Sequence, residues 1–427
     1  MEWIKDGNLD FLNKRKVEAK EEAQKSVASI IAAVKSDGDE ALKNYTKQFD
    51  GIDLDSIRVT EEAMHEAASR VPEQVLKAIK QAASNIRAFH EKQVPKSWTE
   101  TVKEGVVLGQ KVTALDSVGV YVPGGTACYP SSVLMGAIPA LVAGVKRVVL
   151  VSPPQKNGWI ADGVLAAALE IGVHEIDQVG GAQAIAALAY GTESIKPVDK
   201  IVGPGNLYVM LAKKHVFGDV AIDSLAGPSE IAVVADETAD ASWIAADLLS
   251  QAEHDRLSMP ILVTTSEAFG IKVEKEVEKQ LQELPRVEIA SASVYKQGKI
   301  ILAADGHEAA AVINRIAPEH LELATRDPHE IFDLIHNAGA IFLGKYSSEP
   351  VGDYFAGPNH IIPTNGSARY ASPLGVESFI KHSSIIEYSD EALQANGQAI
   401  AAFARFEGLE GHARAVEKRM KGAVIHG

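Results

Sequence analysis

The 427-residue chain contains a single cysteine, Cys128, and this scarcity excludes two kinds of protein. One thiol cannot form an intrachain disulfide, so the chain is not a disulfide-stabilised scaffold, and a zinc site built on several thiolates is also excluded. Basic residues are outnumbered, with 42 Lys and Arg against 57 Asp and Glu and a net charge of −15. Because such a chain is repelled on average by a phosphate backbone, we expect no nucleic-acid partner.

Long hydrophobic runs are also missing. No stretch reaches the roughly 18–20 uninterrupted apolar residues of a membrane-spanning helix. The charged start, MEWIKDGNLDFLNKRKVEAKEE, has no apolar segment of the kind that marks a secretory signal. We therefore expect a cytoplasmic chain without a membrane partner. The apolar fraction of 46% and charged fraction of 23% are those of a globular protein, and the length predicts several domains.

Helices are predicted for most of the first hundred residues. Apolar residues recur at helical spacing from Val27 to Val34, and Gly38 interrupts the pattern. A second helix is predicted after Thr60, where two glutamates favour a helix start. A third apolar stripe runs through 75–89.

From about Val118 the pattern changes to short β-branched runs followed by glycine-rich turns and alanine-rich helical stretches. The predicted strands include 118–122, 147–152, 176–181, 200–206, 231–236, 261–265 and 340–344. Buried strands that alternate with helices indicate parallel sheets covered on both faces. The sequence therefore predicts an α/β fold with two similar, doubly wound, Rossmann-like domains.

Three glycine turns follow predicted strands: PGG (123–125), GGAQ (180–183) and GPGN (203–206). Ligands of doubly wound sheets bind at the carboxyl ends of strands, where main-chain N–H groups can meet phosphate. The usual G-x-G-x-x-G is incomplete, because Tyr208 stands where the third glycine would fall. A nucleotide site and plain tight turns both remain open at this point.

Polar residues with metal-ligand character occur on the predicted helix DLLSQAEHD. Asp247, Gln251 and His254 are spaced by four and three residues, which places them on one helix face. Histidine and carboxylate are zinc ligands and a carboxamide is a less usual one, so the face is either a metal site or a solvated surface.

Two further segments carry candidate chemistry. In IAPEHLEL (316–323), Glu319 and His320 follow a proline that we expect to begin a helix, and an adjacent acid and base suit general base catalysis. A surface capping turn is the alternative. In VGDYFAGPNH (351–360), an irregular loop holds Asp353 and His360, and loops of this kind often carry sites.

The same segments identify a family resemblance. The stretches YVPGG, GGAQAIAALAYGT, VGPGN, AGPSE, LLSQAEHD, APEHLE, VGDYFAGPNH and EGLEGHA are similar, in order, to signatures of the histidinol dehydrogenases. The resemblance covers about residues 25–420. It implies a zinc- and NAD-dependent oxidation of L-histidinol to L-histidine through histidinaldehyde, the last step of histidine biosynthesis, with two NAD+ per turnover.

The resemblance also implies roles for individual residues. One zinc ion per subunit would be held by Gln251, His254, Asp353 and His412, with His412 on an arm that reaches the partner subunit of a homodimer. NAD would contact Tyr121, Gln183 and Asn206. Glu319 and His320 would be the catalytic pair. The substrate would contact Ser229, His320, Glu407 and the four zinc ligands.

We expect four segments in the chain: an N-terminal arm (1–25), a first α/β domain (26–115 with 230–380), an NAD-side α/β domain (116–229) and a helical C-terminal arm (381–427) exchanged between subunits.

Three other functions are compatible with the same residues. Relatives on this scaffold oxidise other amino alcohols or sulfonates, a zinc hydrolase could use Glu319 as its base, and a two-lobed binding protein would need no catalytic pair.

Three residues lie outside the implied machinery. Cys128 could form a thiohemiacetal with an aldehyde, but free cysteines are usually small apolar packing residues, so we expect packing. His360 could orient a ligand or the substrate. Asp247 could play a similar supporting role or belong to a solvated helix face.

Overall fold

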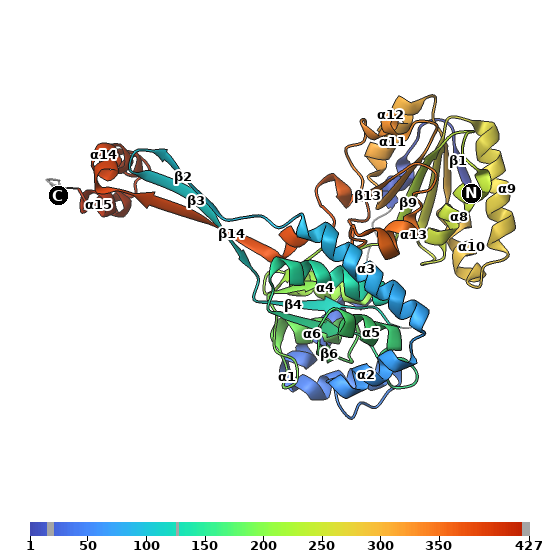
Figure 1. Cartoon of the computed structure of the whole chain (residues 1–427), viewed down its shortest axis with the longest axis horizontal. Helices are drawn as coiled ribbons and strands as arrows, with labels where there is room; N and C mark the ends of the chain where they lie inside the picture. The colour runs from blue at the N-terminus through green and yellow to red at the C-terminus, as the bar shows by residue number, and fades with distance from the viewer. Residues whose placement is uncertain (15–20, 125–127, 421–427) are drawn as a thin grey trace. The chain divides into compact units, whose positions relative to one another are not determined.

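The computed structural model describes residues 1–14, 21–124 and 128–420. These residues fall into two compact units: 1–93 with 115–379, and 94–114 with the residues from 380 onward. The predicted α/β architecture is confirmed in the first unit, which contains two parallel sheets (Figure 1). Within the described ranges, no helix has the length and apolar character needed to cross a membrane.

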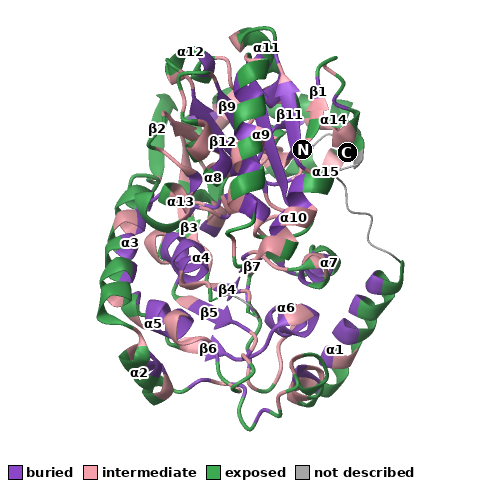
Figure 2. Cartoon of the chain, turned by 90° about the vertical axis from the view of Figure 1, so that its right-hand side faces the viewer, coloured by how far each residue is buried: buried purple, intermediate pink, exposed green. Residues whose placement is uncertain are grey.

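The larger sheet of the first unit has six parallel strands in the order β1-β11-β10-β9-β12-β13. They are β1 (Glu2–Ile4), β9 (Glu230–Ala235), β10 (Met259–Thr264), β11 (Lys299–Leu302), β12 (His320–Ala324) and β13 (Ala340–Leu343). The helices of this lobe are α8 (Ala241–Ala252), α9 (Glu267–Leu281), α10 (Val287–Lys296), α11 (Gly306–Ile316) and α12 (Pro328–Phe332). One apolar cluster joins the sheet to α8–α10 and another joins it to α11 and α12, so helices cover both faces (Figure 1). The strands β9 and β12 between them are buried throughout (Figure 2).

The smaller sheet has five parallel strands in the order β6-β5-β4-β7-β8. They are β4 (Ser117–Tyr121), β5 (Arg147–Val151), β6 (Glu175–Asp177), β7 (Lys200–Val202) and β8 (Ala221–Ile222). The helices between them are α4 (Pro130–Ala143), α5 (Asp162–Glu170), α6 (Gly181–Tyr190) and α7 (Leu207–Val216). Short helical segments of the first unit are η1 (Asp10–Lys14), α13 (Glu349–Val351), η2 (Gly352–Ala356), η3 (Ser367–Arg369) and η4 (Val376–Phe379).

Both sheets have the same strand order. If the strands that alternate with helices are numbered within each lobe, β4–β8 and β9–β13 each follow 3-2-1-4-5, and β1 adds to the edge beside β11. This is the order of the first five strands of a Rossmann sheet. The shared order agrees with the expected pair of similar Rossmann-like domains.

The N-terminal helices pack differently from our expectation. They are α1 (Glu21–Asp50, kinked at Gly38), α2 (Glu61–Arg70) and α3 (Glu73–Glu91). We expected 26–115 to belong with 230–380, but α1 packs on α6 and α7, α2 on α5, and α3 on α4. The reason is that the apolar stripe of α1, including Val27 and Val34, joins the core of the smaller sheet. Residues 1–25 also differ from a simple arm, because β1 pairs with β11.

The second unit contains a three-stranded antiparallel sheet and two helices. Its elements are β2 (Trp98–Lys103), β3 (Val106–Ala114), β14 (Ile380–Tyr388), α14 (Asp390–Phe406) and α15 (Glu410–Glu417). The central strand β3 pairs with β14 along its whole length. The helices α14 and α15 agree with the predicted helical C-terminal arm (381–427), but the first residues of that arm form the strand β14 instead. The strands β2 and β3 were also not predicted. Every residue of β2 is exposed, so it lacks the apolar alternation that marks a half-buried strand.

Candidate active site

His320 begins β12, which lies between β9 and β13 in the larger sheet, and Glu319 directly precedes it. We expected Pro318 to begin a helix, and this is wrong: α11 ends before it, Ala317 adopts a left-handed φ of 48°, and a strand follows. The reason is tertiary, because all five residues from His320 to Ala324 are buried and pair with β9 and β13. The pair therefore lies at the amino edge of its sheet, opposite to the edge where doubly wound sheets usually bind ligands.

The main chain of Glu230, the first residue of β9, holds both members of the pair. Its N–H donates to Glu319 Oε2 at 2.8 Å, and its carbonyl oxygen lies 3.0 Å from His320 Nδ1. A carbonyl only accepts hydrogen bonds, so the proton of the neutral His320 ring is on Nδ1. The lone pair is then on Nε2, which is the nitrogen available for proton transfer.

Burial and charge shift the titration of both groups. Burial raises the pKa of Glu319 to about 8, although the charge of His320 opposes this. Burial disfavours the charged form of His320, but the neighbouring carboxyls of Glu319, Asp353 and Glu349 raise its pKa to about 10. Strongly shifted groups in one buried cluster are typical of catalytic sites. A cation held beside Asp353 would oppose the positive charge on His320 and favour the neutral ring.

Asp353 reaches this cluster from the loop after β13. It lies in the π-helix η2, and its Oδ1 is 3.4 Å from His320 Nε2. Burial opposes its ionisation, but the hydrogen bond with His320 and the charges of His360 and His320 lower its pKa well below the usual value. His360 Nδ1 lies 3.1 Å from the main-chain oxygen of Asp353, and its orienting role stays a prediction.

The loop that carries Asp353 is hydrogen-bonded to helices that pack on the smaller sheet. Asn85 of α3 donates to the carbonyl oxygen of Phe355 at 2.8 Å, and Asn359 donates to the carbonyl oxygen of Met135 in α4 at 2.7 Å. The helices around the smaller sheet therefore set the position of Asp353 beside a histidine of the larger sheet.

Glu349 is a member of the cluster that the sequence did not reveal. Its carboxylate lies 4.0 Å from His320 Nε2, and one ligand atom each from His320, Glu349 and Asp353 lie within 4.8 Å of one another. Burial and the charge of Asp353 raise the pKa of Glu349 to about 8. The main-chain N–H of Glu349 donates to Glu322 at 2.6 Å, and Ser250 donates to its side chain at 3.2 Å.

A signal for this acidic region was present in HLELA, where Glu322 stands between two leucines of a buried strand. Its partner is Asp247 of α8, whose carboxyl shares a hydrogen bond with Glu322 and whose pKa is raised by burial to about 6. Asp247 therefore belongs to a buried acidic network and not to a solvated helix face. For Glu349 itself, the only signal was its spacing of four residues from Asp353.

The predicted zinc ligands Gln251 and His254 lie at the carboxyl end of α8. Gln251 is buried, and its Oε1 has no hydrogen-bond partner among the described residues. His254 lies two residues after the end of α8, and its main-chain N–H donates to the carbonyl oxygen of Gln251 at 3.2 Å. Desolvation lowers the pKa of His254, and the negative charge of Asp353 opposes this, so His254 lies within electrostatic range of the third predicted ligand.

The remaining predicted ligand, His412, and the predicted substrate contact Glu407 belong to the second unit. Glu407 caps the end of α14, His412 lies in α15, and both are exposed. The prediction that these two side chains complete the zinc and substrate site of the first unit stays a prediction.

Tyr121, Gln183 and Asn206 lie at the carboxyl edge of the smaller sheet. Tyr121 ends β4, is buried, and accepts a hydrogen bond from Gly181 at 3.1 Å through its hydroxyl, and burial raises its pKa to about 12. Gln183 is buried in the first turn of α6, and its Oε1 has no hydrogen-bond partner in the described part of the chain. Asn206 caps α7 after β7. Because β4 and β7 flank the point where the strand order reverses, these residues border the place where Rossmann sheets bind nucleotides. Of the first turn, Gly125 lies outside the described residues.

Ser229, another predicted substrate contact of the first unit, lies directly before Glu230. The segment that carries it is held at Gly227, whose N–H donates to Thr364 Oγ1 at 2.7 Å. Ser229 is half-buried, and its carbonyl oxygen accepts from the N–H of Met259 at 3.0 Å. It is therefore held next to the residue that orients the catalytic pair.

Cys128 is exposed, so the expected packing role is wrong. Its position before the first turn of α4 keeps it at the surface, whereas buried positions of α4 begin at Ser131. Partial desolvation nevertheless raises the pKa of its thiol, so little thiolate is present at neutral pH. This does not favour a covalent role.

Comparison with known proteins shows similarity to histidinol dehydrogenases over almost the whole chain. The family model for histidinol dehydrogenase matches residues 13–420. Histidinol dehydrogenase of Bacillus subtilis is 60% identical over 407 residues, 95% of this chain and 95% of that protein. That of Geobacillus kaustophilus is 59% identical over 401 residues, 94% of this chain and 95% of that protein. The crystal structure of histidinol dehydrogenase from Elizabethkingia anophelis has a TM-score of 0.94 at 40% identity and covers 98% of each chain. The chain therefore belongs to the histidinol dehydrogenase family.

Proposed function

We propose that this chain oxidises L-histidinol to L-histidine through histidinaldehyde, with the transfer of two hydrides to NAD+. The observation that carries the proposal is the buried pair of Glu319 and His320, oriented by one peptide group and bordered by Asp353. An acid and a base in this arrangement can serve both oxidation steps. The name shared by the relatives supplies the substrate.

The proton chemistry follows from the two oriented groups. His320 Nε2 accepts the hydroxyl proton of the alcohol as the first hydride leaves its carbon. Glu319, held by Glu230 through one carboxylate oxygen, accepts a proton from the water that adds to the aldehyde. In the same addition, protonated His320 returns its proton to the aldehyde oxygen, which forms the hydrate and leaves His320 neutral again. His320 then accepts a hydroxyl proton of the resulting hydrate as the second hydride leaves. Each of the two hydride transfers needs His320 neutral at its start, with its lone pair on Nε2.

Zinc is the metal that we propose for the site. The buried carboxamide oxygen of Gln251, which lacks a hydrogen-bond partner among the described residues, fits a ligand role, as do the nearby His254 and Asp353. His412 would complete the set. When bound, the ion would anchor the imidazole and amino nitrogens of the substrate, for which nitrogen-binding zinc is suited.

The cofactor would bind against Tyr121, Gln183 and Asn206. The buried Oε1 of Gln183, which has no hydrogen-bond partner in the described part of the chain, supports this, because a bound ligand would satisfy it. Ser229, Glu407 and His412 would contact the substrate. We propose a homodimer in which the helical arm of one subunit brings Glu407 and His412 to the site of the other, since both residues are exposed in their own unit.

The proposal is tested by metal analysis of the purified protein together with histidinol-dependent formation of NADH before and after chelation. We expect one zinc per subunit, two NADH per histidinol, and loss of turnover on chelation that added zinc restores. Turnover of another amino alcohol or of a sulfonate in place of histidinol would contradict the assigned substrate. Unchanged turnover after complete removal of zinc would contradict the anchoring role.

A further inference from the structure

The structure contains a buried ion pair beneath the third glycine turn, remote from the Glu319–His320 pair in sequence. Lys213 of α7 and Asp223, which follows β8, are in direct contact, and their side chains are only 3% and 5% exposed. A buried ion pair is weak grounds for stability, because desolvation of both charges offsets their attraction. What the pair contacts is therefore more informative than its strength.

Both charged groups hold the main chain of Gly203, the residue that begins the turn. Lys213 Nζ donates to the carbonyl oxygen of Gly203 at 3.0 Å, and the Gly203 N–H donates to Asp223 Oδ2 at 2.8 Å. Gly203 has a φ of +114°, and a Cβ at this position would overlap the carbonyl oxygen of Tyr121. The ion pair thus fixes a turn that lies directly against the main chain of Tyr121.

The turn ends at Asn206, which is oriented by its own helix. Its side-chain oxygen accepts from the N–H groups of Tyr208 and Val209 at 3.0 and 3.1 Å. With the oxygen engaged in capping α7, the amide nitrogen of Asn206 is the atom left to contact a ligand. Two of the three proposed cofactor contacts, Tyr121 and Asn206, are therefore related in space through Gly203.

We propose that Lys213 and Asp223 are positioning residues for the dinucleotide. This inference rests on the proposed use of NAD at Tyr121 and Asn206. The pair holds the turn in its ligand-binding conformation before the cofactor arrives, so binding needs no reordering of the turn. Preorganisation of this kind increases affinity by removing a cost of binding, not by adding a contact.

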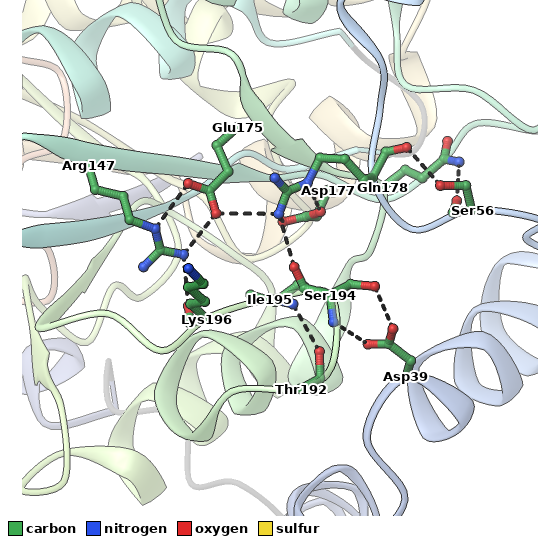
Figure 3. Close-up of polar contacts among 11 residues, drawn as sticks. Asp39, Ser56, Arg147, Glu175, Asp177, Gln178, Thr192, Ser194, Ile195 and Lys196 are labelled. Atoms are coloured by element: carbon green, nitrogen blue, oxygen red, sulfur yellow. Dashed lines mark hydrogen bonds and ion pairs between the residues drawn. The ribbon is translucent and has the colours of Figure 1, made fainter.

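The test compares Lys213→Met and Asp223→Asn with a control pair from the same lobe. Arg147 and Glu175 form an ion pair with a shortest N–O distance of 2.8 Å (Figure 3). The two residues begin β5 and β6, so the pair lies away from the carboxyl edge that bears the turns. Glu175→Gln is therefore a control for loss of an ion pair, and Asn206→Ala is a control for loss of a cofactor contact. The measurements are the Kd of NAD+ for the zinc-loaded enzyme, KM for NAD+, KM for histidinol, and Tm.

We expect Lys213→Met and Asp223→Asn to raise the Kd and KM for NAD+ by about tenfold, the size of effect that an unsatisfied buried polar group produces. KM for histidinol should change by less than about twofold. A general disturbance of the fold would instead raise KM for both NAD+ and histidinol. Glu175→Gln should lower Tm without changing the Kd of NAD+.

A lowered Tm with an unchanged Kd for NAD+ in both variants would overturn the inference and leave the pair a structural role. If Lys213→Met does not fold, the Kd of NAD+ for Asp223→Asn, which keeps the shape of the side chain, provides the test. Failure of the wild-type enzyme to bind NAD+, or no effect of Asn206→Ala, would instead refute the proposed cofactor site.

Discussion

The Nδ1 atom of His320 lies 3.0 Å from the carbonyl oxygen of Glu230. This contact fixes which nitrogen of the ring can take part in proton transfer, because the carbonyl binds only a protonated Nδ1. Nε2 is left facing Asp353 at 3.4 Å, in the region that the substrate would enter. A single peptide group thus sets both the tautomer and the direction of the proposed base.

Glu319→Gln should separate the two oxidation steps. Glutamine can still accept the hydrogen bond from Glu230, so the geometry is kept, but it cannot take a proton from water. We expect oxidation of histidinaldehyde to slow by about 10²–10⁴-fold, with oxidation of histidinol much less affected. Single-turnover formation of NADH from each of the two substrates measures this. As a comparison, His320→Gln should impair both steps. An equal loss of both steps in Glu319→Gln would contradict the assigned role.

Glu349→Gln should weaken zinc binding and activity by roughly 10–100-fold, the usual effect of losing a group that supports a metal ligand. The reason is that Glu349 lies in the cluster with His320 and Asp353. Burial and Asp353 raise its pKa to about 8, but a cation bound there would favour the ionised carboxylate, which adds negative charge beside a proposed ligand. Competition with a chelator measures the zinc affinity. Glu253→Gln, beside His254 but outside that cluster, is the matched control, and equal zinc affinities in the two variants would reject a role for Glu349.

The sequence predicted the parts of the site that lie close together along the chain. Glu319 and His320 are neighbours, so their association needed no knowledge of the fold, and buried strands that alternate with helices predicted both parallel sheets. The position of this pair at the amino edge of the larger sheet could not be predicted in this way. Pro318 is as compatible with the start of a strand as with the start of a helix, and only pairing with β9 and β13 decides between them.

Contacts made by main-chain atoms or by segments far apart in the chain also could not be predicted from the sequence. The role of Glu230 depends on its peptide group, which carries no side-chain signature. Glu349 comes from a short helical turn 29 residues after His320 and meets it only through the loop after β13. The second unit was missed in part because the exposed, polar strand β2 gains its structure from pairing with β3 and not from burial.

His90 should make the stability of the first unit depend on pH. The side chain is fully buried at the end of α3, and its Nδ1 lies 2.8 Å from the carbonyl oxygen of Ile86. Burial lowers its pKa, whereas a histidine of the unfolded chain titrates near 6.5. Below about pH 6.5 the unfolded state binds a proton that the folded state resists, so stability is complete above that pH and falls as the pH approaches the lowered pKa.

We therefore expect the urea midpoint of the wild-type protein to fall more between about pH 7.5 and 5.5 than that of His90→Gln, in which the titrating ring is absent. His65→Gln, at an exposed position on α2, should follow the wild-type profile. Parallel profiles for all three proteins would show that His90 does not contribute.

Cys128→Ser should retain most of the activity in both oxidation steps. Desolvation raises the pKa of the thiol, so the nucleophilic thiolate is scarce at neutral pH, and the proposed chemistry uses water activated by Glu319 instead. Steady-state rates with histidinol and with histidinaldehyde check this. Loss of aldehyde oxidation alone would indicate a thiohemiacetal on Cys128 and would displace Glu319 from its assigned role.

Exchange of the helical arm between subunits predicts complementation between two inactive variants. In a mixed dimer of His412→Ala and Glu319→Ala chains, one of the two sites would combine an intact Glu319 with an intact His412. Random reassociation makes about half of the dimers mixed, so we expect about a quarter of wild-type activity. A mixture of Glu319→Ala with His320→Ala should stay inactive, because both changes lie in the first unit and every site keeps one of them. If the arm instead completed the site of its own subunit, the first mixture would be as inactive as the second.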